Sequence, residues 1–327
     1  MTYFILVPDN LEEAGLAQLR SIPEFTVHAP GKLTRQQTLE LIPQAHAMIV
    51  RSDTKADAEL LAKADNLKVI VRAGVGVDNI DLKECTRRGI VVMNAPDGNT
   101  ISTAEHTFAL LLALARHIPQ ADASVRAGRW ERKKFMGVQL HGKTLGIVGF
   151  GRVGRALADR AKAFGMREIA YDPFVPERIA RHLGLACPTL DALLEQADVI
   201  SLHAVVTDDT RGMINRETIA KMKDGVLIVN AARGSLVNSA DLAEALKSGK
   251  VAGAALDVYD TEPPAPDNPL MGLDNVVYTP HLGASTVEAQ EAVAIQAATE
   301  VIDALLHGEY SNVRNKDVFQ QQAEGQP

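Results

Sequence analysis

Short apolar runs recur along the middle of the chain, and stretches with helical spacing of apolar residues separate most of them. The runs show no polar alternation, which is typical of strands buried on both faces of a parallel sheet. We therefore expect strands at 145–149, 169–172, 199–202, 226–230, 253–257 and 276–279, with helices such as 153–164 and 240–246 between them. Six strands in this alternation predict a doubly wound α/β sheet.

The N-terminal part of the chain repeats the pattern on a smaller scale. Candidate strands lie at 3–7, 25–28, 47–51, 68–72 and 90–93, which predicts a second, flavodoxin-like parallel sheet. A long apolar helix is expected over about 101–118, and a C-terminal helix over about 286–306 has the length to cross back to the first sheet. The expected domains are therefore 1–97 with 288–327, and 98–287.

Composition narrows the possible partners. The chain has 327 residues, of which 46% are hydrophobic and 23% charged, with a formal net charge of -7. Binding to nucleic acid or to an anionic membrane surface would favour basic stripes, so neither partner is expected. The longest apolar stretch, near 107–115, is too short to span a bilayer, and the N-terminus lacks a basic start. We expect a cytoplasmic protein.

A glycine fingerprint follows the first strand of the central sheet. Gly149-Phe150-Gly151-Arg152-Val153-Gly154 has the form G-x-G-x-x-G at a strand-to-helix turn, and Asp172 lies at the end of the next strand. These glycines permit a tight turn and close approach of a pyrophosphate, and the acid can accept hydrogen bonds from ribose hydroxyls. A 2′-phosphate would meet like charge, so NAD is favoured over NADP. The alternative is a glycine-rich turn of another α/β protein, and neighbouring basic residues could still accommodate NADP.

Three polar residues follow consecutive strands of the same sheet: Arg233, Glu262 and His281. Strand carboxyl ends form the ligand crevice of an open α/β sheet, so the three side chains can meet there. His281 can exchange a hydroxyl proton, Glu262 can orient the imidazole, and Arg233 can hold a carboxylate. This set suits alcohol–ketone redox chemistry without a metal. Taken singly, His281 could also be a turn histidine, Glu262 a loop acid and Arg233 a surface cation.

At these residues the chain resembles the D-2-hydroxyacid dehydrogenase family. The resemblance runs from about 45 to 313 and rests on 72–79, the fingerprint with Asp172, and the segments 230–234, 257–263 and 279–283. It implies that 98–287 is the NAD-binding Rossmann domain and that 1–97 with 288–327 is a substrate-binding lid. It also implies the three catalytic roles above. The implied cofactor contacts are Gly149, Gly151, Arg152, Val153, Gly154, Asp172, Ala204, Ala232, Asp257, Gly283 and Ala284.

Within the family, the segments 98–102, 130–137 and 281–286 most resemble the D-3-phosphoglycerate dehydrogenases. The resemblance implies NAD-dependent oxidation of a phosphorylated 2-hydroxy acid, D-3-phosphoglycerate, to 3-phosphohydroxypyruvate in serine biosynthesis. A substrate with a phosphate and a carboxylate needs several cations. The expected substrate-binding residues are Arg51, Arg72, Val75, Gly76 and Asn99, with Arg132 and Lys133 from a partner subunit. The alternative for 132–134 is a solvated basic turn.

Three expectations remain about assembly and alternatives. The helix at 101–118 and Trp130 suggest a two-fold dimer interface. Many phosphoglycerate dehydrogenases carry C-terminal domains that sense serine, and we expect none here because the chain ends soon after the last helix. The rival functions are a glyoxylate/hydroxypyruvate reductase and, more remotely, an NAD-sensing corepressor that binds cofactor without turnover.

Overall fold

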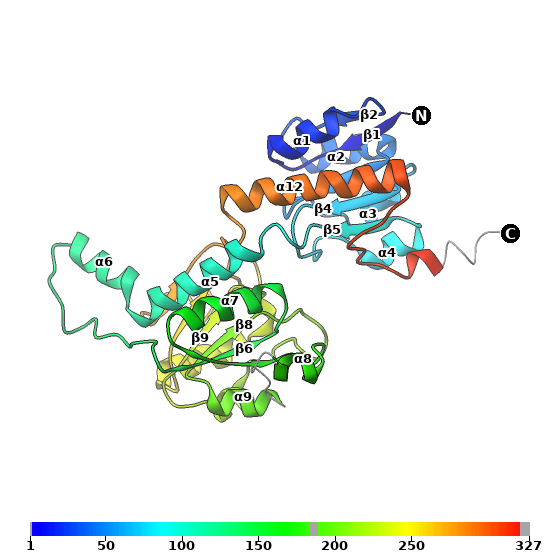
Figure 1. The fold of residues 1–327 in the computed structure, drawn as a ribbon. Helices are drawn as coiled ribbons and strands as arrows, with labels where there is room; N and C mark the ends of the chain where they lie inside the picture. The colour runs from blue at the N-terminus through cyan, green and yellow to red at the C-terminus, as the bar shows by residue number, and fades with distance from the viewer. Residues whose placement is uncertain (1, 183–188, 321–327) are drawn as a thin grey trace. The chain divides into compact units, whose positions relative to one another are not determined.

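The computed structural model describes residues 2–182 and 189–320. Contacts between Cα atoms divide the chain into two compact units. Unit 1 consists of the described parts of 1–99 and 285–327, and unit 2 consists of those of 100–284. Each unit is built on its own parallel sheet (Figure 1). No helix of the described segments is long and apolar enough to cross a membrane.

Unit 2 contains the larger sheet. Its strands are β6 (Thr144–Val148), β7 (Arg167–Tyr171), β8 (Val199–Leu202), β9 (Val226–Asn230), β10 (Val251–Leu256) and β11 (Val276–Tyr278). They pair in parallel in the order β11-β10-β9-β8-β6-β7. The chain leaves β6 toward β7 on one side and returns to β8 on the other. The predicted doubly wound sheet is therefore confirmed, with its topological switch point between β6 and β8.

Helices cover both faces of this sheet because successive strand residues point to opposite sides. On one face, α5 (Thr100–Ala115) and α7 (Arg152–Ala163) bury apolar side chains against Leu145 and Ile147. On the other face, α9 (Leu190–Gln196), α10 (Arg216–Lys221) and α11 (Ser239–Ser248) pack against Val148 and Ile228. Unit 2 also contains α6 (Ile118–Arg126), α8 (Glu177–His182) and the short helix η2 (Gly234–Leu236). Burial on both sides explains why the strands lack polar alternation.

The helix expected over 101–118 is interrupted in the structure. α5 ends at Ala115, and α6 begins at Ile118 after His117, which has a left-handed φ of 52°. Pro119 has no N–H to donate to the carbonyl of Ala115, so one helix cannot run through it. The amide of Val138 donates to that carbonyl instead, at 2.9 Å.

Unit 1 has a five-stranded sheet in the order β2-β1-β3-β4-β5, which is the flavodoxin-like order. Its strands are β1 (Tyr3–Leu6), β2 (Phe25–His28), β3 (Ala47–Val50), β4 (Val69–Arg72) and β5 (Val91–Asn94). Its helices are α1 (Glu13–Arg20), α2 (Arg35–Leu41), η1 (Ile42–Gln44), α3 (Ala58–Ala62), α4 (Leu82–Arg87), α12 (Val287–Ile302) and the π-helical turn η3 (Asp303–His307). α12 returns to the N-terminal sheet and lies along α1 (Figure 1), where Ala297 and Val301 join the core of β1 and β4.

Candidate active site

The glycine fingerprint lies at the switch point of the unit 2 sheet. Gly149 directly follows β6 with φ 94°, and a Cβ there would lie 2.5 Å from the backbone N of Ala204, after β8. A Cβ on Gly154 would lie 2.4 Å from the carbonyl O of Gly149, so this glycine lets α7 pack on the turn. Gly151 caps the N-terminus of α7, and no heavy atom lies within 4 Å of a Cβ there. The turn is thus closed toward the sheet and open at the helix N-terminus, which fits a pyrophosphate.

Asp172 lies beside this turn, directly after β7. Its Oδ2 accepts a hydrogen bond from Phe150 N at 2.8 Å, and its Oδ1 accepts one from Phe174 N at 2.8 Å. These bonds fix the carboxylate, and each oxygen retains a lone pair for a hydroxyl donor. Arg152 and Val153 form the first turn of α7, with Arg152 exposed. The residues present therefore fit the adenosine half of a dinucleotide.

His281 and Glu262 form a contact at the carboxyl edge of the sheet. His281 Nδ1 lies 2.7 Å from Glu262 Oε2, and Glu262 Oε1 accepts a hydrogen bond from Tyr259 N at 3.1 Å. Burial alone would raise the pKa of Glu262, but the hydrogen bond from His281 and the charge of Arg233 hold it below its usual value. Because Nδ1 faces the carboxylate, Nε2 is the nitrogen left for proton exchange with a substrate.

Arg233 follows β9 on the adjacent loop. The side-chain amide of Asn230 folds this loop, since it donates to Arg233 O at 2.8 Å and accepts from Ala232 N at 3.1 Å. A Cβ on Gly234 would lie 1.9 Å from the backbone carbon of Tyr259, so the loops after β9 and β10 touch. The structure thus brings the three predicted catalytic side chains to one edge of one sheet.

An apolar recess of about 450 Å³ adjoins His281 and Glu262. Tyr259 lines it and donates from its hydroxyl to Thr279 O at 3.1 Å. Burial raises the pKa of Tyr259 to about 12, so the phenol stays a neutral donor. The apolar lining of this recess lowers the polarity around His281 and Glu262, which strengthens the electrostatic contact between them.

Sequence reasoning missed two histidines near these residues. His203 Nε2 lies 2.8 Å from Ser201 Oγ, and burial lowers the pKa of His203 to about 4, which keeps the ring neutral beside the fingerprint turn. His106, on α5, contacts the buried carboxylate of Asp257 at 3.1 Å. The partner of His106 lies 151 positions away, so no local pattern could indicate the contact.

The predicted substrate cations of unit 1 lie at the carboxyl edge of its sheet. Arg72 ends β4 and pairs with Val50 of β3, so Arg51 follows at the same edge. Asn94 Nδ2 donates to Val75 O at 2.6 Å, and this bond holds the loop that contains Val75 and Gly76. Asn99 is the last residue of this part of the unit and is half-buried.

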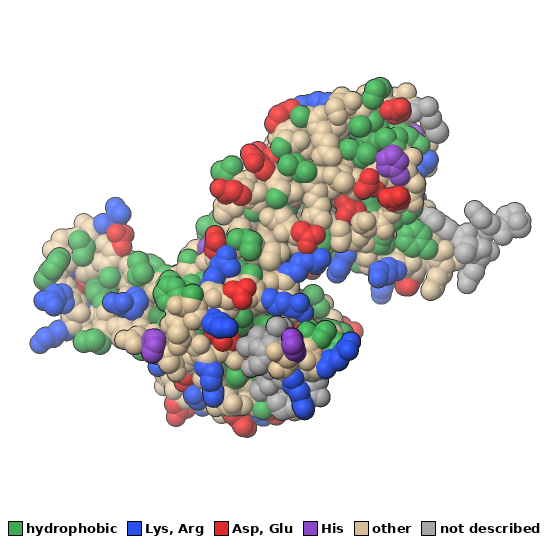
Figure 2. Space-filling view, in the orientation of Figure 1, with side chains coloured by type: hydrophobic (Ala, Val, Ile, Leu, Met, Phe, Trp, Pro, Cys, Tyr) green, Lys and Arg blue, Asp and Glu red, His purple; other side chains and the backbone are tan. Residues whose placement is uncertain are grey.

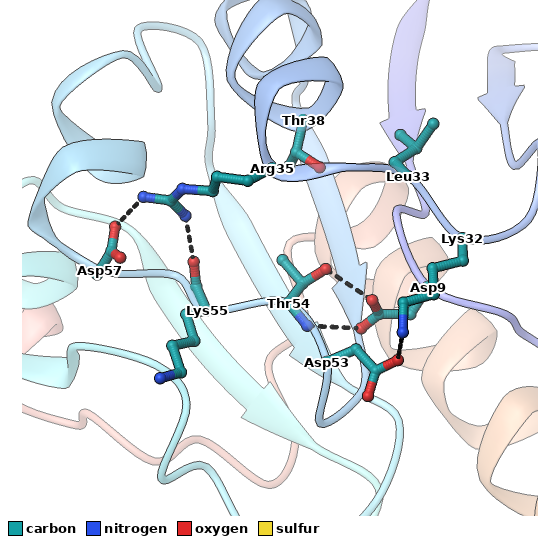
Figure 3. Close-up of a pocket in the computed structure, with 9 residues that line it drawn as sticks. All are labelled: Asp9, Lys32, Leu33, Arg35, Thr38, Asp53, Thr54, Lys55 and Asp57. Atoms are coloured by element: carbon teal, nitrogen blue, oxygen red, sulfur yellow. Dashed lines mark hydrogen bonds and ion pairs between the residues drawn. The ribbon is translucent and has the colours of Figure 1, made fainter.

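Asp9 fixes the backbone of Arg51. Asp9 Oδ2 accepts a hydrogen bond from Arg51 N at 2.5 Å. Figure 3 shows the same carboxylate beside Thr54, whose Oγ1 donates to Asp9 Oδ1 at 2.6 Å. The adjoining cavity, of about 190 Å³, is lined by Asp9, Lys32, Leu33, Arg35, Thr38, Asp53, Thr54, Lys55 and Asp57. Its three basic and three acidic side chains balance, and Lys32 pairs with Asp53 at 2.6 Å. The charges that line this cavity therefore balance one another, and it presents no surplus of positive charge to an anion.

Arg132 and Lys133 are exposed on the segment after α6. Nearby Trp130 and Met136 are each 79% exposed. Figure 2 shows hydrophobic and basic side chains together on the part of unit 2 that carries α6. Among the residues that the structure describes, no three His, Cys, Asp or Glu side chains are placed to hold a metal ion.

Comparisons with known proteins agree with this geometry. The model of the D-isomer specific 2-hydroxyacid dehydrogenase, NAD binding domain, matches residues 108–283. The chain is 53% identical to D-3-phosphoglycerate dehydrogenase of Bacillus subtilis and 52% identical to that of Archaeoglobus fulgidus. Each alignment covers 91% of this chain and 56% of the relative, so the chain spans about half the length of these curated relatives.

A solved structure extends the likeness to both units. The crystal structure of a glyoxylate reductase from Paecilomyes thermophila matches with a TM-score of 0.86 and 31% identity, covering 97% of this chain and 99% of that one. Together with the family model, this shows that the chain belongs to the D-isomer specific 2-hydroxyacid dehydrogenase family, with its NAD-binding domain in unit 2.

Proposed function

We propose that this chain catalyses the NAD-dependent oxidation of D-3-phosphoglycerate to 3-phosphohydroxypyruvate, the first step of serine biosynthesis. The observation that carries the chemistry is the 2.7 Å contact between His281 Nδ1 and Glu262 Oε2 beside Arg233. The substrate assignment rests on the likeness to the D-3-phosphoglycerate dehydrogenases of Bacillus subtilis and Archaeoglobus fulgidus. It is supported by Arg51 and Arg72 at the edge of the unit 1 sheet.

His281 is the proposed general acid and base. In the oxidation, its Nε2 takes the proton of the substrate's C2 hydroxyl, and in the reduction it returns that proton. Glu262 accepts from Nδ1, which keeps the ring oriented, and stabilises the imidazolium that forms. Because His281 and Glu262 are both partly exposed, the proton can pass to solvent after each turnover.

Arg233 is the proposed anchor for the reacting end of the substrate. Its planar guanidinium can donate to the substrate carboxylate and to the C2 oxygen together. On the other unit, the backbone amides of Val75 and Gly76 would bind the carboxylate. Arg51 and Arg72 would bind the phosphate, with Arg132 and Lys133 supplied by a second copy of the chain.

NAD would supply the hydride acceptor for the hydrogen on C2. Gly149, Gly151 and Gly154 would hold its pyrophosphate at the N-terminus of α7, and Asp172 would bind the ribose hydroxyls. The remaining contacts that we propose are Arg152, Val153, Ala204, Ala232, Asp257, Gly283 and Ala284. Because Asp172 is an acid, we propose NAD rather than NADP.

We further propose a homodimer and a cytoplasmic location. Large apolar side chains are exposed on α5 (Ile101), on α6 (Ile118 and Val125) and on the segment after α6 (Trp130), at 52% to 79%. Exposed apolar side chains that gather in this way on α6 and the segment after it are typical of a protein interface. Sedimentation of a monomer at micromolar concentration would contradict the dimer.

The test is the initial rate of NADH oxidation with 3-phosphohydroxypyruvate and with hydroxypyruvate. We expect a strong preference for the phosphorylated substrate, and in Arg51→Ala/Arg72→Ala this preference should fall about a hundredfold because a charge-assisted phosphate contact is lost. Lys32→Ala is the matched control, since Lys32 is an exposed cation already paired with Asp53. If the double variant keeps the wild-type ratio, the phosphate assignment is wrong.

The second candidate is a glyoxylate/hydroxypyruvate reductase. The match to a solved glyoxylate reductase, with 31% identity over both units, favours it. Such an enzyme would share His281, Glu262 and Arg233 but would prefer hydroxypyruvate or glyoxylate in the same assay. A corepressor-like protein would bind NADH and show no substrate-dependent change in absorbance.

A further inference from the structure

The backbone of His281 is held in an unfavourable conformation. Its φ is 57°, in the left-handed region that residues other than glycine rarely occupy. Such a residue persists only when its surroundings over-determine it. The groups around the turn 279–283 must therefore hold it in this conformation.

One residue receives hydrogen bonds from almost the whole turn. Asp257 follows β10, and its side chain is fully buried. Its Oδ1 accepts from Thr279 Oγ1 at 2.6 Å and from Leu282 N at 2.7 Å, and its Oδ2 accepts from Gly283 N at 2.9 Å. His281 N donates to the backbone O of Asp257 at 2.8 Å. Every residue of the turn except Pro280 thus donates to Asp257.

His106 completes the contacts of this carboxylate from helix α5. Its Nε2 lies 3.1 Å from Asp257 Oδ1 and 3.2 Å from Thr279 Oγ1. The hydroxyl proton of Thr279 is committed to Asp257, and an ionised carboxylate only accepts. Both groups therefore present acceptors, so His106 Nε2 carries the proton and donates between them. Burial would raise the pKa of Asp257, but the hydrogen bonds from His106, Thr279 and Leu282 keep it below its usual value.

The same helix face also holds the far end of the turn. Ser102 Oγ donates to Gly283 O at 2.7 Å, and Thr103 Oγ1 donates to it at 3.2 Å. Positions 102, 103 and 106 share one face of a helix. α5 therefore binds the turn directly at Gly283, through Ser102 and Thr103. Through His106 and Asp257 it also contacts the rest of the turn indirectly.

We propose that His106 is a positioning residue for the proposed acid/base His281. It acts through Asp257, together with the Ser102 anchor, and keeps the left-handed turn in the one geometry that directs Nδ1 of His281 to Glu262. The inference rests on the proposed role of His281. It assigns to the N-terminal half of α5 a part in the chemistry that the strand-end residues perform.

The test compares His106→Leu, which removes the donor, with His106→Gln, whose amide can still donate at similar reach. In His106→Leu we expect kcat with 3-phosphohydroxypyruvate to fall roughly ten- to a hundredfold with little change in KM, since misplacing a catalytic group by about 1 Å costs on this order. His106→Gln should recover most of that loss. Glu105→Gln is the control on the same helix, because it weakens only the exposed pair with Arg160 and should leave kcat unchanged.

The second readout needs no turnover. In protein labelled with ¹⁵N-histidine, His281 should show a single tautomer protonated at Nδ1, and this signal should broaden or shift in His106→Leu and return in His106→Gln. If wild type fails to turn over but this pattern holds, the proposed function fails and the positioning role survives. Wild-type kcat and an unchanged His281 signal in His106→Leu would overturn the inference.

Should His106→Leu not fold, Ser102→Ala/Thr103→Val provides the same comparison, since it removes both hydroxyls that donate to Gly283 O without touching the buried carboxylate. A folded Ser102→Ala/Thr103→Val protein with a perturbed His281 signal and lower kcat supports the inference. If it has the wild-type signal and kcat, it overturns the inference.

Discussion

We propose that Asp172 determines the choice between NAD and NADP. Its two carboxylate oxygens are fixed by the amides of Phe150 and Phe174, at 2.8 Å each, so the charge cannot swing away from the ribose position. The substitution Asp172→Asn removes the charge and keeps one acceptor oxygen. The amide nitrogen then faces a backbone N–H, which costs about 1 kcal/mol of stability.

The magnitude follows from charge and distance. A 2′-phosphate carries about -1.5 to -2 charges at pH 7. At roughly 5 Å and an effective dielectric constant of about 20, each charge pair is worth about 3 kcal/mol. Partial exposure and salt reduce the net penalty to about 1–2 kcal/mol. Loss of charge-assisted bonds to the ribose weakens NADH binding by a similar amount, so the NADH/NADPH affinity ratio should fall about a hundredfold in the variant.

Fluorescence titration of NADH and NADPH measures this ratio directly. Asp159→Asn, which removes an exposed acid from the same helix as the fingerprint, is the control and should keep the wild-type ratio. An Asp172→Asn protein that is folded and retains the wild-type ratio would refute the assignment of Asp172 to the ribose.

Three further predictions follow from single contacts. Glu262→Gln should lower kcat/KM about tenfold, because a charge-assisted hydrogen bond to His281 between half-exposed groups is worth about 1–1.5 kcal/mol, as steady-state kinetics would show. The lowered pKa of His203, about 4, means that the unfolded chain binds a proton there at higher pH than the folded chain. Protonation of His203 in the unfolded chain should therefore lower the free energy of unfolding as the pH falls from 6.5 toward about 4, by up to ~1.4 kcal/mol per pH unit. Chemical denaturation at several pH values measures this decline, which should be shallower in His203→Gln. Gly149→Ala should lower the thermal midpoint, because its φ is 94° and the added Cβ would meet Ala204 N at 2.5 Å; an unchanged midpoint would contradict the close approach.

The fold could be predicted from the sequence because its signals are local. A strand buried on both faces forms an apolar run, as in 226–230, and this is visible without any partner. The fingerprint likewise contains its turn, its helix cap and its packing glycine within six residues, from Gly149 to Gly154. Residues that follow the strands could be grouped because the carboxyl ends of parallel strands lie at one edge of the sheet. This predicted that Glu262 lies near His281, and the two side chains are in contact in the structure.

What the sequence did not show depends on distant partners. The break between α5 and α6 follows from Pro119, but the apolar periodicity on either side concealed it. His106 lies just before the apolar run of α5, between Glu105 and Thr107, and its role depends on the carboxylate of Asp257, which follows β10 far along the chain. The proposed roles of Arg132 and Lys133 depend on a second copy of the chain, so they stay predictions.

In the proposed reaction, His281 exchanges a proton with the substrate during hydride transfer. The most direct measurement is the loss of NADH absorbance with 3-phosphohydroxypyruvate for wild type and for His281→Asn. Asparagine tolerates a left-handed φ, so the turn can remain intact while the acid/base group is lost. We predict substrate-dependent turnover by wild type and a loss of at least about a hundredfold in kcat in the folded variant. Comparable turnover by the two proteins would contradict the account.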